Sequence, residues 1–149
     1  MPKIPELRKG DIERIIEASK RKPERVVEIY EEIRREFNQV YDRDQELGKL
    51  NSYEASLLRK EYEERDYPTR EMVGKLKTII EREELVIQRI ESHRKKVGEF
   101  ISSHKQDLDR KSIKVLEVMI QRYNNIKMKL EKDVKENWNI IRRWETEIP

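Results

Sequence analysis

Two histidines, His93 and His104, are the side chains of this chain best suited to metal binding or proton transfer. They are eleven positions apart in a segment of helical periodicity, so they share a face but lie roughly 16 Å apart. They therefore cannot bind one ion. A di-iron helical bundle needs Glu-x-x-His motifs, whereas Ile90 and Ile101 stand three positions before these histidines. The position of His93 on the apolar face indicates a buried or interface histidine.

Nucleophilic catalysis also lacks a candidate. The chain has no Cys, which excludes thiol nucleophiles, disulfides and thiolate metal sites. Ser102, Ser103 and His104 are consecutive, but neighbouring residues on a helix do not face each other. The glycines are isolated, so no phosphate-binding loop is present. We therefore predict a protein that is not an enzyme, with no cofactor, no metal and no small-molecule substrate.

A basic cluster in the C-terminal part could contact phosphates or an acidic partner. Residues 85–149 carry 15 basic and 10 acidic side chains, whereas residues 1–84 carry 19 and 21. The cluster brackets a predicted turn at 106–109 and consists of Arg89, Arg94, Lys95, Lys96, Lys105, Arg110, Lys111 and Lys114. Such a patch is typical of nucleic-acid contacts. The alternative is the solvated surface of a charge-rich protein, since no aromatic residues are interleaved for base stacking.

The C-terminal segment combines two tryptophans with isoleucines on more than one helix face. These residues are Trp138, Ile140, Ile141, Trp144 and Ile148. A helix that is apolar around much of its circumference must be covered on several sides, and Trp is enriched at interface hot spots. The segment is thus either a protein interface that docks another subunit or a part of its own bundle. In the second case we expect it to pack against Ile12, Ile15 and Ile16.

Long helices with short connections are expected to position these residues. The predicted segments are a lead with a short helix at 1–22 and long helices at 23–66, 69–105 and 109–148. Gly48, Asn51 and Ser52 predict a break in the first long helix near 48–52. Pro68 ends that helix, and Thr69 caps the next one. Apolar residues recur at alternating steps of three and four, which is heptad spacing.

Composition agrees with an all-α fold. The chain is 44 % charged and only 35 % hydrophobic, which suits helices that bury a narrow stripe. We predict a single domain, an antiparallel bundle of three to four long, coiled-coil-like helices. No apolar run is long enough to span a membrane and no signal region is evident, so we expect a soluble, cytoplasmic protein. The abundance of charge without Cys is typical of thermophiles, although an AT-rich genome produces a similar bias.

Several stretches resemble the GINS-family α-helical domain. Residues 30–37, followed by residues 46–50 and Tyr53, are similar to its start, where a helix leads through an E-L-x-x-L stretch into a polar-aromatic helix start. Residues 87–101 are similar to its helix rich in Ile, Arg and Lys, and an acidic turn at 107–109 follows. The similarity covers about residues 26–130. The chain departs from the family in having no Phe near Tyr53 and no small β domain.

This resemblance implies a scaffold subunit of the archaeal-type, tetrameric GINS complex of DNA replication. Such a subunit bridges the replicative helicase, a RecJ-like partner and a primase or polymerase, and it has no catalytic site. Its partners would be other protein subunits in a homo- or hetero-oligomer. Two further hypotheses remain. One is a helical bundle that binds nucleic acid directly, chromatin-like or viral, and the other is a self-assembling coiled-coil structural protein.

Overall fold

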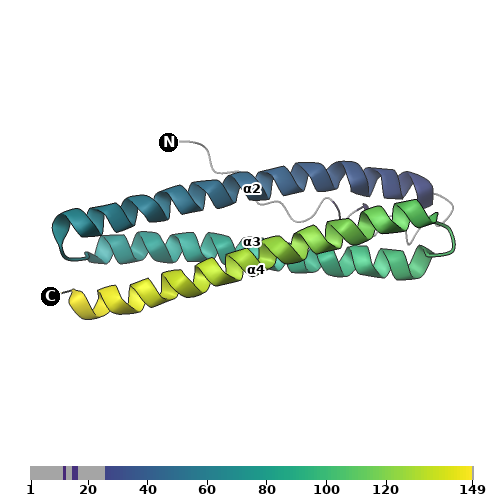
Figure 1. Ribbon diagram of the computed structural model, residues 1–149. Helices are drawn as coiled ribbons and strands as arrows, with labels where there is room; N and C mark the ends of the chain where they lie inside the picture. The colour runs from purple at the N-terminus through teal and green to yellow at the C-terminus, as the bar shows by residue number, and fades with distance from the viewer. Residues whose placement is uncertain (1–11, 13–14, 17–25, 149) are drawn as a thin grey trace.

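Three long antiparallel helices make up most of the described chain (Figure 1). The computed structural model describes Ile12, Ile15, Ile16 and residues 26–148. The helices are α2 (Val26–Arg65), α3 (Arg70–His104) and α4 (Arg110–Glu147). They form an elongated bundle in which α3 packs most extensively against α4 and less so against α2. The predicted all-α bundle is confirmed, and no strand occurs among these residues.

The two turns follow from local chemistry. Asp66 has a φ of 62°, in the left-handed region that ends helices, and its N–H donates to the carbonyl of Tyr62 at 2.9 Å. The hydroxyl of Thr69 accepts from the N–H of Met72 at 3.2 Å, which confirms the predicted N-cap. At the second turn, Asp109 Oδ1 caps α4 by accepting from the N–H of Ser112 at 2.6 Å. The bounds of α3 and α4 thus differ from the predicted ones by a single residue.

The break predicted near 48–52 is wrong, because α2 continues through these residues. Gly48 and Ser52 fall off the buried stripe, whereas Leu47, Asn51 and Ala55 follow it at steps of four. Packing of this stripe against α3 outweighs the helix-propensity cost relative to alanine, which is about 1 kcal/mol for glycine and less for asparagine. Tertiary contacts therefore keep α2 continuous where local sequence favours an end.

The core is divided into two clusters. The first core cluster lies toward the α3–α4 turn and contains Phe37, Ile90, Phe100, Leu116 and Tyr123 among others. The second core cluster lies toward the α2–α3 turn and contains Leu58, Met72, Leu76, Ile141 and Trp144 among others. Buried polar residues occupy stripe positions between and beside them. These are Asp44, Asn51, Glu83, His93 and Asn137.

The segment before α2 contributes to the first core cluster. Ile12, Ile15 and Ile16 are helical, as predicted for a short helix, and Ile12 and Ile16 are buried. The other residues of the predicted lead and short helix at 1–22 lie outside the described residues.

Replacement of Gly48 by alanine tests the continuity of α2. A Cβ at this position meets no atom within 4 Å. Because alanine favours a helix interior over glycine, we expect Gly48→Ala to raise the free energy of unfolding by about 0.5–1 kcal/mol. Urea denaturation followed by circular dichroism measures the change. Gly74→Ala, in the equally open interior of α3, should give a gain of similar size. A loss of stability at Gly48 alone would contradict a continuous α2.

Candidate functional site

The tryptophan-rich end of α4 packs into its own bundle. Ile141 and Trp144 are each 1 % exposed within the second core cluster. The Trp144 ring stacks on Tyr62 of α2, with centroids 5.5 Å apart. The protein-interface prediction is therefore wrong for Ile141 and Trp144, because α2 and α3 already cover them. The expected packing against Ile12 is also wrong, since that residue belongs to the first core cluster.

The remaining three residues of this segment keep part of their surface. Trp138, Ile140 and Ile148 are half-buried against the second core cluster. Their apolar atoms extend the core outward along α4 rather than forming a separate face. Whether they also contact another subunit stays a prediction.

Arg89 does not belong to a surface patch. Its side chain is 9 % exposed and forms a buried ion pair with Asp44 of α2. Burial and the neighbouring Arg43 lower the pKa of Arg89, but a guanidinium still carries its charge at neutral pH. The prediction that Arg89 contacts nucleic acid or a partner is therefore wrong. Arg89 lies on the side of α3 that faces α2, so its side chain is buried rather than exposed to solvent.

Two other members of the predicted basic cluster are engaged on α3 itself. Arg94 donates to Glu91 at 2.8 Å, and Lys96 lies 3.7 Å from Glu99. Lys127 of α4 also pairs with Glu91, and both cations lower the pKa of that carboxyl. The local charge around Glu91 is thus largely balanced.

The other five members of the cluster are exposed around the α3–α4 turn. These five are Lys95, Lys105, Arg110, Lys111 and Lys114. None of them forms an ion pair with a described residue. Acidic side chains of Glu99, Asp107, Asp109 and Glu117 lie among them. Asp109, whose pKa is lowered chiefly by its hydrogen bond to Ser112, lies beside Lys111.

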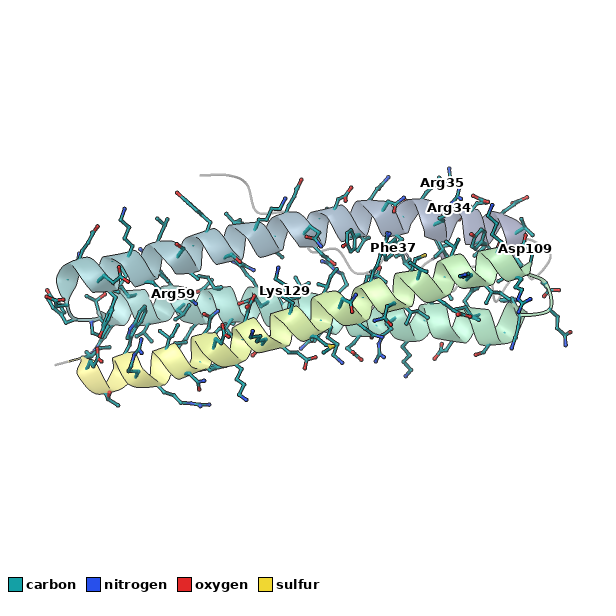
Figure 2. All side chains as sticks on the ribbon, viewed as in Figure 1. Arg34, Arg35, Phe37, Arg59, Asp109 and Lys129 are labelled. Carbon is teal, nitrogen blue, oxygen red and sulfur yellow. The ribbon has the colours of Figure 1, made fainter. Side chains whose placement is uncertain are left out.

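Two of these lysines lie on a groove between α2 and α4, which we call the basic groove. It encloses about 380 Å³. Its floor is apolar and consists of Phe37, Val115, Val118 and Met119. Its cationic rim consists of Arg34, Lys111, Lys114 and Arg122, and Asn38 also lines it. Figure 2 shows Phe37 extending from α2 toward α4, with Arg34 one turn earlier on the same helix.

Sequence reasoning missed the groove because its rim comes from two helices. Arg34 and Arg122 are 88 positions apart in the chain, so no local count of charges joins them. One signal was present on α4, where Lys111, Lys114 and Val118 recur at steps of three and four and share a face. Val118 is 45 % exposed on that face.

A polar contact between α3 and α4 separates the main apolar layers. Asn137 Nδ2 donates to Glu83 Oε1 at 3.2 Å, and both residues are buried. Burial and the nearby Asp133 raise the pKa of Glu83 to about 7, while the hydrogen bond from Asn137 opposes that rise. Glu83 therefore titrates near neutral pH although it lies on an otherwise apolar stripe.

His93 occupies the buried position that its place on the stripe predicts. It is 0 % exposed. Its Nδ1 and the hydroxyl of Tyr123 are 3.3 Å apart, in hydrogen-bond contact. Burial raises the pKa of Tyr123, so the phenol stays neutral. The contact ties α3 to α4 and needs no metal or substrate to explain it.

The described residues contain no group of three or more His, Asp or Glu side chains that could hold a metal ion. Among the described helices, none is both long and apolar enough to cross a membrane. Comparison of the chain with protein-family models, with curated proteins and with solved structures gives no match. The candidate site is therefore the basic groove, and its geometry alone supports that choice.

Truncation of Trp144 tests the packed end of α4. Because Trp144 fills the second core cluster, we expect Trp144→Ala to lower the free energy of unfolding by about 3–5 kcal/mol. The half-buried Trp138 is the matched control, and Trp138→Ala should cost less. Urea unfolding monitored by circular dichroism gives both values. An unchanged stability combined with a changed oligomeric state for Trp144→Ala would favour a docking role instead.

The raised pKa of Glu83 predicts a pH dependence of stability. Its pKa rises from 4.5 to about 7 in the folded protein, so the folded state binds more protons between these values. The contribution of Glu83 to stability therefore falls as pH increases from about 4.5 to about 7 and then levels off. Glu83→Gln removes this term.

We therefore expect the variant to gain stability over the natural sequence as pH rises through that window. Thermal unfolding of both proteins at several pH values gives the difference in stability between them. Contributions from the other carboxyls are the same in both and cancel in that difference. A difference that is constant with pH would show that Glu83 titrates normally.

Proposed function

We propose that this chain is a non-enzymatic assembly subunit that binds an acidic, amphipathic segment of a partner protein in the basic groove. The observation that carries the proposal is the combination of an apolar floor with a rim of four cations. Helix-in-groove recognition uses apolar anchors for affinity, and complementary charge on the rim steers and orients the partner.

The state of the rim cations supports this function. Lys111 and Lys114 form no ion pair with any described residue, and no acidic side chain lines the groove. Arg34 forms an exposed ion pair with Glu31 of the same helix at 3.2 Å. The guanidinium of Arg122 lies over the ring of Tyr41, 5.9 Å from its centroid. Two cations are thus held in place by neighbours and two are left for an incoming carboxylate.

The floor favours a protein segment over a purely ionic ligand. Phe37 and Met119 are buried and belong to the first core cluster, so core packing holds this part of the floor in place. Val118 is the exposed apolar member of the floor. Burial of one such apolar side chain by a ligand contributes about 1.5–3 kcal/mol to binding. A ligand that offers only phosphates cannot gain this free energy.

In its most specific form, the proposed role is that of a GINS-like component of the DNA replication machinery, which bridges a helicase and partner proteins. Residue similarity over about residues 26–130 is its support. The groove would then be one docking surface of such a scaffold. A self-assembling coiled-coil structural protein is the variant in which the partner is another copy of the chain.

Direct nucleic-acid binding is the second candidate function. It is favoured by the exposed, unpaired cations at the α3–α4 turn, including Lys95, Lys105 and Arg110, which lie beyond the groove. A ligand of this kind would contact the lysines and arginines but would not need Val118.

A binding assay with two labelled probes separates these functions. One probe is a helical peptide with leucines along one face and glutamates beside them, and the other is a short DNA duplex. Fluorescence anisotropy at low salt measures both. We expect the peptide to bind, and Lys111→Glu combined with Lys114→Glu to weaken it by roughly tenfold, or about 1.4 kcal/mol.

The matched control reverses Lys129 and Lys132, which have the same spacing on α4 but lie outside the groove. Figure 2 shows Lys129 far from Asp109 along that helix. This control should retain peptide binding. Val118→Ser should weaken the peptide by roughly fivefold, because about 1 kcal/mol of apolar burial is lost, and leave DNA binding unchanged. Binding of the duplex alone, insensitive to Val118, would replace the assembly role with nucleic-acid binding.

A further inference from the structure

A second, smaller pocket lies in the polar middle of the bundle, away from the basic groove. It encloses about 130 Å³ and is lined by all three helices. Asn51, Glu83 and Asn137 form its buried inner part, and Ser52, Arg59 and Glu136 are exposed at its mouth. The pocket thus runs from solvent to buried polar groups, and it has room for several water-sized groups.

Asn51 carries a buried polar atom that no described residue satisfies. It is 3 % exposed, and its Oδ1 is buried without a hydrogen-bond partner among the described residues. Buried side-chain oxygens are almost always hydrogen-bonded. Since Asn51 lines the pocket, the group that would satisfy this oxygen is a donor that enters from the mouth.

Charge defines that donor further. Three carboxyls line the pocket, from Glu83, Asp133 and Glu136, against one guanidinium from Arg59. The amide of Asn137 already donates to Glu83. The pocket is therefore rich in acceptors and negative in charge. Because its carboxyls do not converge as a metal site, the better match is a charged group that brings its own N–H donors.

We propose that this pocket binds a protonated aliphatic primary amine. An ammonium group has three donors and no acceptor, so the inner ammonium bridges Asn51 Oδ1 and the Glu83 carboxylate. In a short diamine, the second ammonium lies at the mouth beside Asp133 and Glu136. The small volume selects a thin aliphatic chain over a ring.

Binding is coupled to a proton on Glu83. The other charged groups that line the pocket with Glu83 are Asp133 and Glu136 from α4 and Arg59 from α2. Burial and Asp133 raise the pKa of Glu83 to about 7, whereas a bound ammonium favours the ionised form. Near pH 7 the amine therefore displaces a proton from Glu83, and its affinity falls as the pH is lowered.

Isothermal titration with putrescine tests the site in the folded chain at low salt. We expect saturable binding at pH 8 that is weaker at pH 6. Titrations near pH 7 in phosphate and in Tris should give different apparent enthalpies, because the released proton is taken up by the buffer. Butanediol has the same chain length without charge and should not bind.

Two variants locate the binding within the pocket. Asn51→Leu removes the acceptor and keeps the branched shape of the side chain, and Glu83→Gln removes the charge that the inner ammonium contacts. Each variant should bind putrescine about tenfold or more weakly, since a hydrogen bond to a charged group is lost. Glu117→Gln is the matched control, an exposed carboxyl of α4 outside the pocket. Circular dichroism verifies that each variant is folded.

The proposal is overturned if putrescine does not bind the folded chain, or if butanediol binds as well as putrescine. It is equally overturned if both pocket variants retain the affinity of the natural sequence. None of these results depends on the basic groove, so the site stands or falls separately from the assembly role.

Discussion

The buried ion pair between Asp44 and Arg89 determines how α2 lies along α3. A heptad seam of aliphatic side chains tolerates a shift by one repeat, because each repeat presents a similar surface. Here such a shift would leave both charges buried and unpaired, at a cost of about 3–5 kcal/mol. The hydrogen bond from Asn137 to Glu83 restricts α3 and α4 in the same way. Polar pairs therefore select one register among those that the apolar stripe allows.

Local chemistry made the helices and their turns predictable from sequence. Pro68 and Thr69 affect only the backbone next to them, and the heptad stripe of α3 depends only on residue type and spacing. The turn and the helix could therefore be predicted from the sequence. The continuity of α2 was not, because Gly48 and Asn51 are weak helix formers whose neighbours pack on α3. Propensity describes a helix in isolation, whereas this helix is held by another one.

The candidate site was less predictable because it depends on which side chains meet across helices. Counting charges along the chain predicted a basic cluster around the α3–α4 turn, yet that cluster included Arg89, which its ion pair with Asp44 buries. The sequence also left open whether Trp144 docks a partner or packs in its own bundle, because Tyr62, which stacks on it, is far away in the chain. The basic groove needs Arg34 from α2, which no segment of α4 reveals.

The division of the core into two clusters has a consequence for dynamics. Each cluster unites one end of the bundle, and the polar middle adds few apolar contacts between them. Proteins open in cooperative units whose free energies are lower than that of global unfolding. Because each end has its own core cluster, we expect the two ends of this rod to be such units. The end that holds Trp144 would then open and close while the end that carries the basic groove stays folded, so motion at the far end would not displace a bound partner.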